Sequence, residues 1–243
     1  MCYMIITGGS LIWFLLSLIA DMCVISAIVT PKWLIGPSAQ AFTVTTPHLP
    51  LTGAQHNETI AVTTTTTTLR YPSVGIYTRC KAIQNIRHSQ YHCGAFDLDG
   101  FATDSEIYPS TWKAAMFFIS LGFVILTLTV LCTLISCCRQ SMFGKSIHNM
   151  TACAQVTAGI SVMLSLFLHP LGWSATRVQL LCGADAEPFY AAGCSLGISF
   201  YSAIAGVVLC FVCAGISLKA ESSNMRSRVK RRVEEGDRLV CIP

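Results

Sequence analysis

The chain has 243 residues, of which 12% are charged and 53% are hydrophobic, and its formal net charge is +4. Its mean hydropathy is +0.58. Soluble globular domains carry about 25% charged residues, so this composition excludes a soluble enzyme and an intrinsically disordered chain. The basic excess lies in one tail, which gives no support to nucleic-acid binding.

Four long apolar segments account for the low charge. They span residues 10–30, 114–138, 152–173 and 190–218. Asp21 is their only Asp, Glu, Lys or Arg side chain. About 20 apolar residues in a helix cross the hydrocarbon core of a bilayer, so each segment predicts a transmembrane helix. The first is expected to be a retained helix, because no Lys or Arg precedes it and its apolar run exceeds that of a signal peptide. The predicted fold class is therefore an all-α membrane protein, a four-transmembrane-helix bundle.

A basic tail predicts the orientation of this bundle. Residues 219–243 contain seven Lys and Arg side chains directly after the last span. Basic residues beside a span mark the cytosolic side, so both termini are expected in the cytosol and the loops 31–113 and 174–189 outside the cell. Residues 1–218 then form a single tetraspan domain of a plasma-membrane protein. The tail would also suit contact with anionic lipid or a retention signal that is masked on assembly.

The cysteines fit this topology. Four of the thirteen fall in or beside the outer loops, as Cys80 with Cys93 and Cys182 with Cys194. Disulfides persist on the oxidising side of the membrane. We expect local bonds, Cys80–Cys93 and Cys182–Cys194, because pairing within one loop needs no cross-loop geometry; two cross-loop bridges are the alternative that the sequence leaves open.

The first outer loop has two different halves. Residues 38–70 are rich in Thr and Pro and poor in large apolar residues, which predicts a flexible extension, either O-glycosylated or a plain spacer. Asn57 begins a glycosylation sequon in this half. Residues 71–112 contain short strand-like segments separated by glycines, which predicts a small folded unit tied by the first disulfide.

Some residues in and beside the spans invite functional interpretations. A carboxylate such as Asp21 is costly in a bilayer, so it should pair with a partner subunit or accept a hydrogen bond from Ser or Thr within the bundle. Gly193 and Gly197 have the spacing that lets two helices approach closely, either inside the bundle or against a partner helix. Cys137 and Cys138 beside a basic residue resemble a palmitoylation site, with plain membrane cysteines as the alternative.

No catalytic, cofactor-binding or metal site is expected. The spans lack paired carboxylates, a nucleophile with a nearby base and a Gly-rich phosphate loop. His88 and His92 lie near Cys93, but Cys93 has a disulfide partner and no fourth ligand is evident for zinc.

Three parts of the first loop match a known pattern. Trp33 follows the first span, the residues at 75–80 read GIYTRC, and Cys93 follows. This order resembles the Trp…Gly-Leu-Trp-x-x-Cys…Cys pattern of the claudin and peripheral myelin protein superfamily of tetraspan proteins. Tyr77 stands where claudins have Trp.

More specific stretches resemble one family within it, the lipoma HMGIC fusion partner-like (LHFPL) tetraspan family. They are PKWLIG at 31–36, YPSTWKA at 108–114 and the segment 168–197, which holds the second cysteine pair that claudins lack. The resemblance implies a claudin-like bundle with a small extracellular antiparallel β-sheet. It also implies an auxiliary subunit of channels or receptors, of the mechanotransduction-channel or GABA-A-receptor type.

The sequence thus predicts a non-enzymatic auxiliary subunit of a plasma-membrane channel or receptor complex. Its expected partners are the lipid bilayer and a multi-span channel or receptor, with a homo-oligomer as a further option and no nucleic acid. A claudin-like adhesion or barrier protein is the alternative. A small pore or transporter is disfavoured because intramembrane charge is nearly absent.

Overall fold

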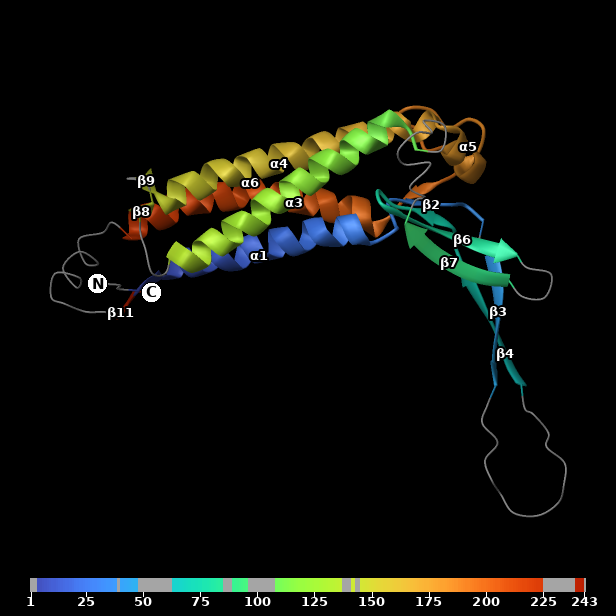
Figure 1. The fold of residues 1–243 in the computed structure, drawn as a ribbon, viewed down its shortest axis with the longest axis horizontal. Helices are drawn as coiled ribbons and strands as arrows, with labels where there is room; N and C mark the ends of the chain where they lie inside the picture. The colour runs from blue at the N-terminus through green and yellow to red at the C-terminus, as the bar shows by residue number, and fades with distance from the viewer. Residues whose placement is uncertain are drawn as a thin grey trace, which may run out of the picture.

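The computed structural model describes residues 4–38, 40–47, 63–84, 89–95, 108–136, 141–142, 145–224 and 239–242. Four long helices run side by side along the molecule, as Figure 1 shows. The larger β-sheet lies at one end of the helices, and β1 and β11 lie at the other. We call these the head end and the terminal end.

The four long helices are all long and apolar enough to cross a bilayer. They are α1 (Gly8–Val29), α3 (Ser110–Ser136), α4 (Ile147–Leu171) and α6 (Ile198–Asn224). Large apolar side chains such as Ile19, Leu128 and Phe167 are exposed on the outside of the bundle, where lipid would surround them. The four-helix membrane fold predicted from the sequence is confirmed.

The helices form a closed ring in which α1 contacts α3 and α6, and α4 contacts the same two helices. Val24, Ile119, Leu126 and Val162 are buried in its core. Small residues allow the close contacts: a Cβ atom on Gly122 would lie 2.7 Å from Cγ2 of Val162. Packing between backbones and small side chains is how helices associate where lipid is as apolar as leucine.

The fourth helix begins eight residues later than predicted, at Ile198 rather than residue 190. Residues 190–197 form turns and the short strand β10 (Ser195–Leu196) instead. The prediction that Gly193 and Gly197 form a helix-packing pair is therefore wrong, since both precede the helix. The glycine of α6 that packs against another helix is Gly206, where a Cβ atom would lie 2.8 Å from Cγ2 of Val24.

The head contains a five-stranded antiparallel sheet in the order β10-β2-β5-β6-β7. Besides β10, its strands are β2 (Leu34–Ile35), β5 (Ser73–Val74), β6 (Thr78–Gln84) and β7 (Ser89–Ala95). These strands come from both outer loops. Strand β10 lies in the second loop, after the third long helix, and β2, β5, β6 and β7 lie in the first loop, after the first helix. The two loops thus share one sheet.

A short helical region completes the head. The 3₁₀ turn η1 (Gly172–Ser174) ends α4, and α5 (Thr176–Cys182) follows within the second loop. Pro170 at the end of α4 is followed by this change of helical type, as expected for a residue that crowds the preceding turn.

Two disulfides brace the head. Cys80 and Cys93 are direct cross-strand partners on β6 and β7 and are bonded to each other. Cys182, the last residue of α5, is bonded to Cys194. Each bond closes a stretch within one loop, and the cross-loop alternative is not the arrangement in the structure.

The Thr-rich half of the first loop departs from expectation. Within residues 38–70, β3 (Gln40–Pro47) and β4 (Thr63–Arg70) form an antiparallel ribbon that projects from the head in Figure 1. The register pairs Thr43 with Thr67 and Thr45 with Thr65. Thr is β-branched and favours extended backbone, which explains why a stretch without large apolar residues forms strands. Residues 48–62 lie outside the described part.

Two short two-stranded sheets lie at the terminal end of the described structure. β1 (Met4–Thr7) pairs in parallel with β11 (Leu239–Ile242), and β8 (Ser141–Met142) pairs with β9 (Lys145–Ser146). The first pairing brings the two ends of the chain together.

Candidate functional site

An aromatic cluster joins the head to the helices. Three of the four tryptophans, Trp33, Trp112 and Trp173, surround His169, whose side chain is fully buried. The indole of Trp112 stacks on the imidazole with ring centroids 5.0 Å apart, and Trp33 lies 4.6 Å from it at a tilt. Phe200 of α6 packs edge-on against Trp33. Trp33 after α1, Trp112 of α3 and Trp173 of η1 thus meet at His169 of α4, and Phe200 of α6 joins the cluster through Trp33.

Hydrogen bonds fix the orientation of these rings. The indole nitrogen of Trp173 donates to Nδ1 of His169 at 3.2 Å, which places the imidazole proton on Nε2. The indole of Trp112 donates to the backbone carbonyl of His169 at 2.9 Å, and that of Trp33 to the carbonyl of Ala27 at 2.7 Å. Buried indoles with satisfied donors make a rigid joint. Trp173 is itself buried in this joint.

Tyr108 extends the joint into the sheet. Its hydroxyl donates a hydrogen bond of 2.6 Å to the backbone carbonyl of Ile76, and its ring packs edge-on against Trp112. Burial raises the pKa of Tyr108, so the phenol stays neutral and keeps its proton for this bond.

Close backbone contacts hold the two loops together. The backbone nitrogen of Gly197 donates to the carbonyl of Trp33 at 2.9 Å, and that of Trp33 donates to the carbonyl of Val74 at 3.0 Å. A Cβ atom on Gly197 would collide with the backbone carbonyl of Lys32. Gly193 likewise donates to the carbonyl of Cys182 at 2.9 Å. The two glycines therefore serve loop and sheet contacts.

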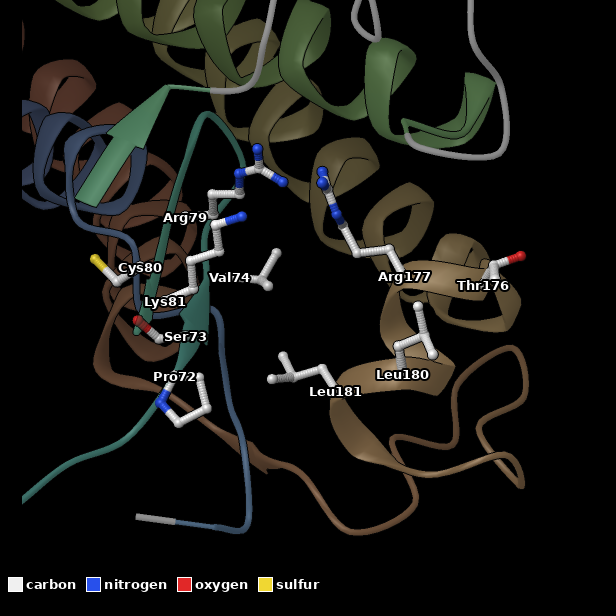
Figure 2. A pocket seen from close by; sticks show the side chains of 10 residues that line it. All are labelled: Pro72, Ser73, Val74, Arg79, Cys80, Lys81, Thr176, Arg177, Leu180 and Leu181. Atoms are coloured by element: carbon white, nitrogen blue, oxygen red, sulfur yellow. The ribbon is translucent and has the colours of Figure 1, made fainter. Parts of the chain in front are cut away.

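A groove of about 420 Å³ opens in the head between the sheet and α5. Three basic side chains line it, Arg79 and Lys81 from β6 and Arg177 from α5. Figure 2 shows these side chains at one end of the groove, and Val74, Leu180 and Leu181 toward the other end. Within the part of the chain that the structure describes, no Asp or Glu side chain lines this groove. The groove offers positive charge beside an apolar surface.

Large apolar side chains are exposed on the head, outside every span. Leu180 is 85% exposed, Phe189 is 56% exposed and Tyr77 is 48% exposed. Phe189 has a positive φ of 64°, which is rare for a bulky residue, and its backbone nitrogen donates to the carbonyl of Pro170 at 3.1 Å. The turn therefore holds this aromatic ring away from the core at some conformational cost.

Asp21 lies inside the bundle, where its carboxyl oxygens are 3.3 and 3.5 Å from the hydroxyl of Thr127 on α3. This contact is the intrabundle arrangement that the sequence left open beside a partner contact. The hydroxyl of Thr127 also lies 3.0 Å from the carbonyl of Phe123, and Thr129 and Thr133, two further threonines of α3, bond to carbonyls of their own helix.

A second polar contact inside the membrane region was not anticipated. Trp13 of α1 donates through its indole nitrogen to the side-chain oxygen of Gln155 on α4 at 3.2 Å, and the amide of Gln155 donates to the hydroxyl of Ser17 at 2.7 Å. All three side chains are buried. The signal in the sequence was a single Gln within an apolar segment, which would have been recognisable as a buried polar group needing a partner.

Other predicted sites fall outside the described residues. They are Asn57, Cys137, Cys138, His88 and the tail from residue 225 to 238. Among the residues that the structure does describe, no group of three or more His, Cys, Asp and Glu could hold a metal ion.

The fold and the aromatic joint can be set beside known proteins. The sequence profile of the lipoma HMGIC fusion partner-like protein family matches residues 9–219. The chain belongs to this family. LHFPL tetraspan subfamily member 2a of Danio rerio is 33% identical over 242 residues, and member 2 of Homo sapiens is 33% identical over 244 residues. Both alignments cover 100% of this chain and of the relative.

More distant LHFPL proteins match over a shorter stretch. Member 3 of Homo sapiens is 28% identical over 111 residues, which is 45% of each chain. Membership confirms the resemblance inferred from the first-loop and 168–197 motifs, and with the four spanning helices it makes the chain a multi-pass membrane protein of the LHFPL family.

Proposed function

We propose that this LHFPL protein is a non-enzymatic auxiliary subunit of a channel or receptor complex in the plasma membrane, supporting its assembly, trafficking or clustering. In this proposal the head faces the outside of the cell and both termini face the cytosol. The basic residues after α6 and the disulfides of the head support that orientation.

The observation that carries the proposal is the exposed apolar surface of the head. Leu180, Phe189 and Tyr77 lie outside the four apolar helices that could cross a bilayer. Exposed apolar and aromatic side chains on a water-facing surface mark interaction sites. The Cys182–Cys194 disulfide braces the segment that carries Phe189 and adjoins Leu180, which lowers the entropy lost on binding.

The alternative is a claudin-like adhesion or barrier protein. The feature that favours it is the ribbon of β3 and β4, which extends from the head away from the helices in Figure 1. A projecting ribbon would suit contact with a neighbouring cell.

Purification from one cell type separates the two functions. The tagged chain is expressed in cells, extracted in mild detergent and purified, and co-purifying proteins are quantified by mass spectrometry. We expect a different membrane protein to be recovered in proportion to the tagged chain, and its amount at the cell surface to fall when the chain is depleted.

A matched pair of variants makes the test specific. Phe189→Ala removes a ring on the head, whereas Phe117→Ala removes one from the lipid-facing side of α3, where Phe117 is 61% exposed. Recovery of the partner should fall for the first and not for the second. Recovery of only the chain itself, with accumulation at contacts between mixed cells, would replace the proposal with the adhesion function.

A further inference from the structure

The carboxyl group of Asp21 lies deep in α1 and has little inside the bundle to pair with. Asp21 precedes the end of α1 at Val29 by eight residues, which places it about 12 Å inside the helix. The hydroxyl of Thr127 carries one proton, and the carbonyl of Phe123 lies closer to it, at 3.0 Å, than either carboxyl oxygen of Asp21, at 3.3 and 3.5 Å. Among the residues that the structure describes, no Lys, Arg or His side chain forms an ion pair with Asp21. A carboxylate can accept about four hydrogen bonds, so most of this capacity is unused.

The outward face of α1 has the residue spacing of a helix-pairing seam. Its members alternate steps of four and three residues along the helix: Leu11, Leu15, Leu18, Met22, Ile25 and Val29. Four of them are exposed and the other two are half-buried. Figure 1 shows α1 along one side of the bundle. Alternating steps of three and four residues are the pattern by which two helices pair with a left-handed crossing, the commonest crossing in membrane bundles.

Asp21 flanks this seam at the place where paired helices carry their charges. It directly precedes Met22, which puts it beside the seam rather than within it. In paired helices, side chains at this flanking position reach across to the facing helix and form ion pairs that select the partner. Asp21 is half-buried, so part of its side chain is accessible from the outward face. Lipid alone would account for the apolar members of the seam, but not for a carboxyl group beside them.

We propose that the outward face of α1 binds a transmembrane helix of the partner protein, and that Asp21 pairs there with a Lys or Arg side chain of that helix. The proposal rests on the proposed function, because it names the part of the partner that this chain would hold within the membrane. Apolar side chains of the partner helix would pack on Leu15, Met22 and Val29.

The charge of Asp21 favours this occupant over two others. A second copy of this chain could not supply the cation, because its four apolar segments contain no Lys or Arg. Lipid headgroups carry positively charged amines, but they stay at the surface of the bilayer. A Lys or Arg within a partner's span is costly when it is alone and gains most from a carboxylate at the same depth.

Site-specific photo-crosslinking tests the proposal in the full-length chain in cells. The photoreactive amino acid p-benzoyl-phenylalanine replaces Met22, which is 64% exposed, and crosslinked peptides are identified by mass spectrometry. The matched control replaces Phe167, which is 57% exposed on α4, across the ring from α1. We expect position 22 to capture an apolar segment of another membrane protein that contains Lys or Arg, and position 167 not to capture that segment.

Charge substitutions then test the ion pair. Asp21→Asn keeps the size of the side chain but removes its charge, so it should reduce the crosslink from position 22 by about tenfold or more. Asp21→Glu retains the charge and should retain most of the crosslink. Asp185→Asn removes an exposed carboxyl group from the head and should leave the crosslink unchanged.

Two further measurements separate pairing from a general loss of structure. The Tm of the purified Asp21→Asn chain should not fall, because this variant removes a costly charge from the apolar region. Asp21→Lys should abolish the crosslink, and changing the basic residue of the captured helix to Asp should restore it.

The outcomes distinguish this proposal from the proposed function. A partner that co-purifies but does not crosslink from position 22 overturns the proposal and leaves the auxiliary role intact. Crosslinks only to lipid, to a second copy or to a span without Lys or Arg also overturn it, as does an undiminished crosslink in Asp21→Asn. If no membrane protein co-purifies, the proposed function fails and this proposal fails with it.

Discussion

Replacing Gly197 by Ala tests whether the loops and helices meet as described. A Cβ atom at this position would overlap the backbone carbonyl of Lys32, which cannot rotate away as a flexible side chain would. To make room, the start of α6 must move from residues 32 and 33. That movement strains two backbone hydrogen bonds, Gly197 to Trp33 at 2.9 Å and Ser199 to Lys32 at 3.2 Å.

The expected loss of stability follows from these contacts. Each backbone hydrogen bond contributes about 1 kcal/mol, and overpacking costs about 1–3 kcal/mol. We expect Gly197→Ala to lower the free energy of unfolding by about 3 kcal/mol, which corresponds to a fall in Tm of roughly 6–12 °C for a chain of this size.

The assay is the amount of monodisperse protein that survives heating in detergent, followed by size-exclusion chromatography with fluorescence detection. Gly215→Ala is the matched control, because no atom lies within 4 Å of its added Cβ atom and Ala favours helix over Gly by up to about 1 kcal/mol. Gly193→Ala should have a smaller effect than Gly197→Ala, since its nearest neighbour would be 3.0 Å away. Equal Tm values for Gly197→Ala and Gly215→Ala would refute the contact.

Three further substitutions test other contacts by the same heating assay. Thr127→Val should lower stability by about 1 kcal/mol by removing the donor beside Asp21, and should cost less when Asp21→Asn is also present; additive effects would contradict the contact. Gln155→Leu should cost about 1–3 kcal/mol because it leaves the buried indole of Trp13 without its acceptor, and an unchanged Tm would show that the two side chains do not bond. Tyr108→Phe should cost about 1 kcal/mol at neutral pH by removing the bond to Ile76. Because burial raises the pKa of this phenol, its stabilising contribution is complete below the unfolded pKa of about 10 and is lost as the pH rises above it, so a cost that is independent of pH between 8 and 11 would argue against a buried, neutral phenol.

The four spanning helices could be predicted because each depends only on properties of its own stretch of sequence. Each span needs only length and low charge, and both are visible in one segment at a time. Helix ends were less predictable, since residues 190–197 carry no charged side chain that would separate them from the helix that follows. What removes them from the helix is pairing of β10 with β2, which lies about 160 residues earlier in the chain. That contact leaves no trace in the local sequence.

The candidate site shows the same division. Asp21 was recognisable because a carboxylate stands out in an apolar segment, and a Ser or Thr donor within the bundle, the role Thr127 fills, was one of the two arrangements expected for it. His169 carries no such signal in the sequence. Its place at the centre of three tryptophans depends on bringing the ends of four helices together. The groove could not be predicted, because its two walls come from different loops.

The shared sheet has a consequence for biosynthesis. Strand β2 pairs with β5 on one side and with β10 on the other, so its second edge is completed by a segment near residue 195. A nascent chain that has emerged only as far as its third span leaves the polar groups of Leu34 and Ile35 at an open edge. The sheet of the head therefore closes only after synthesis reaches the start of the last helix, so its closure marks a chain in which the first three long helices have all been made.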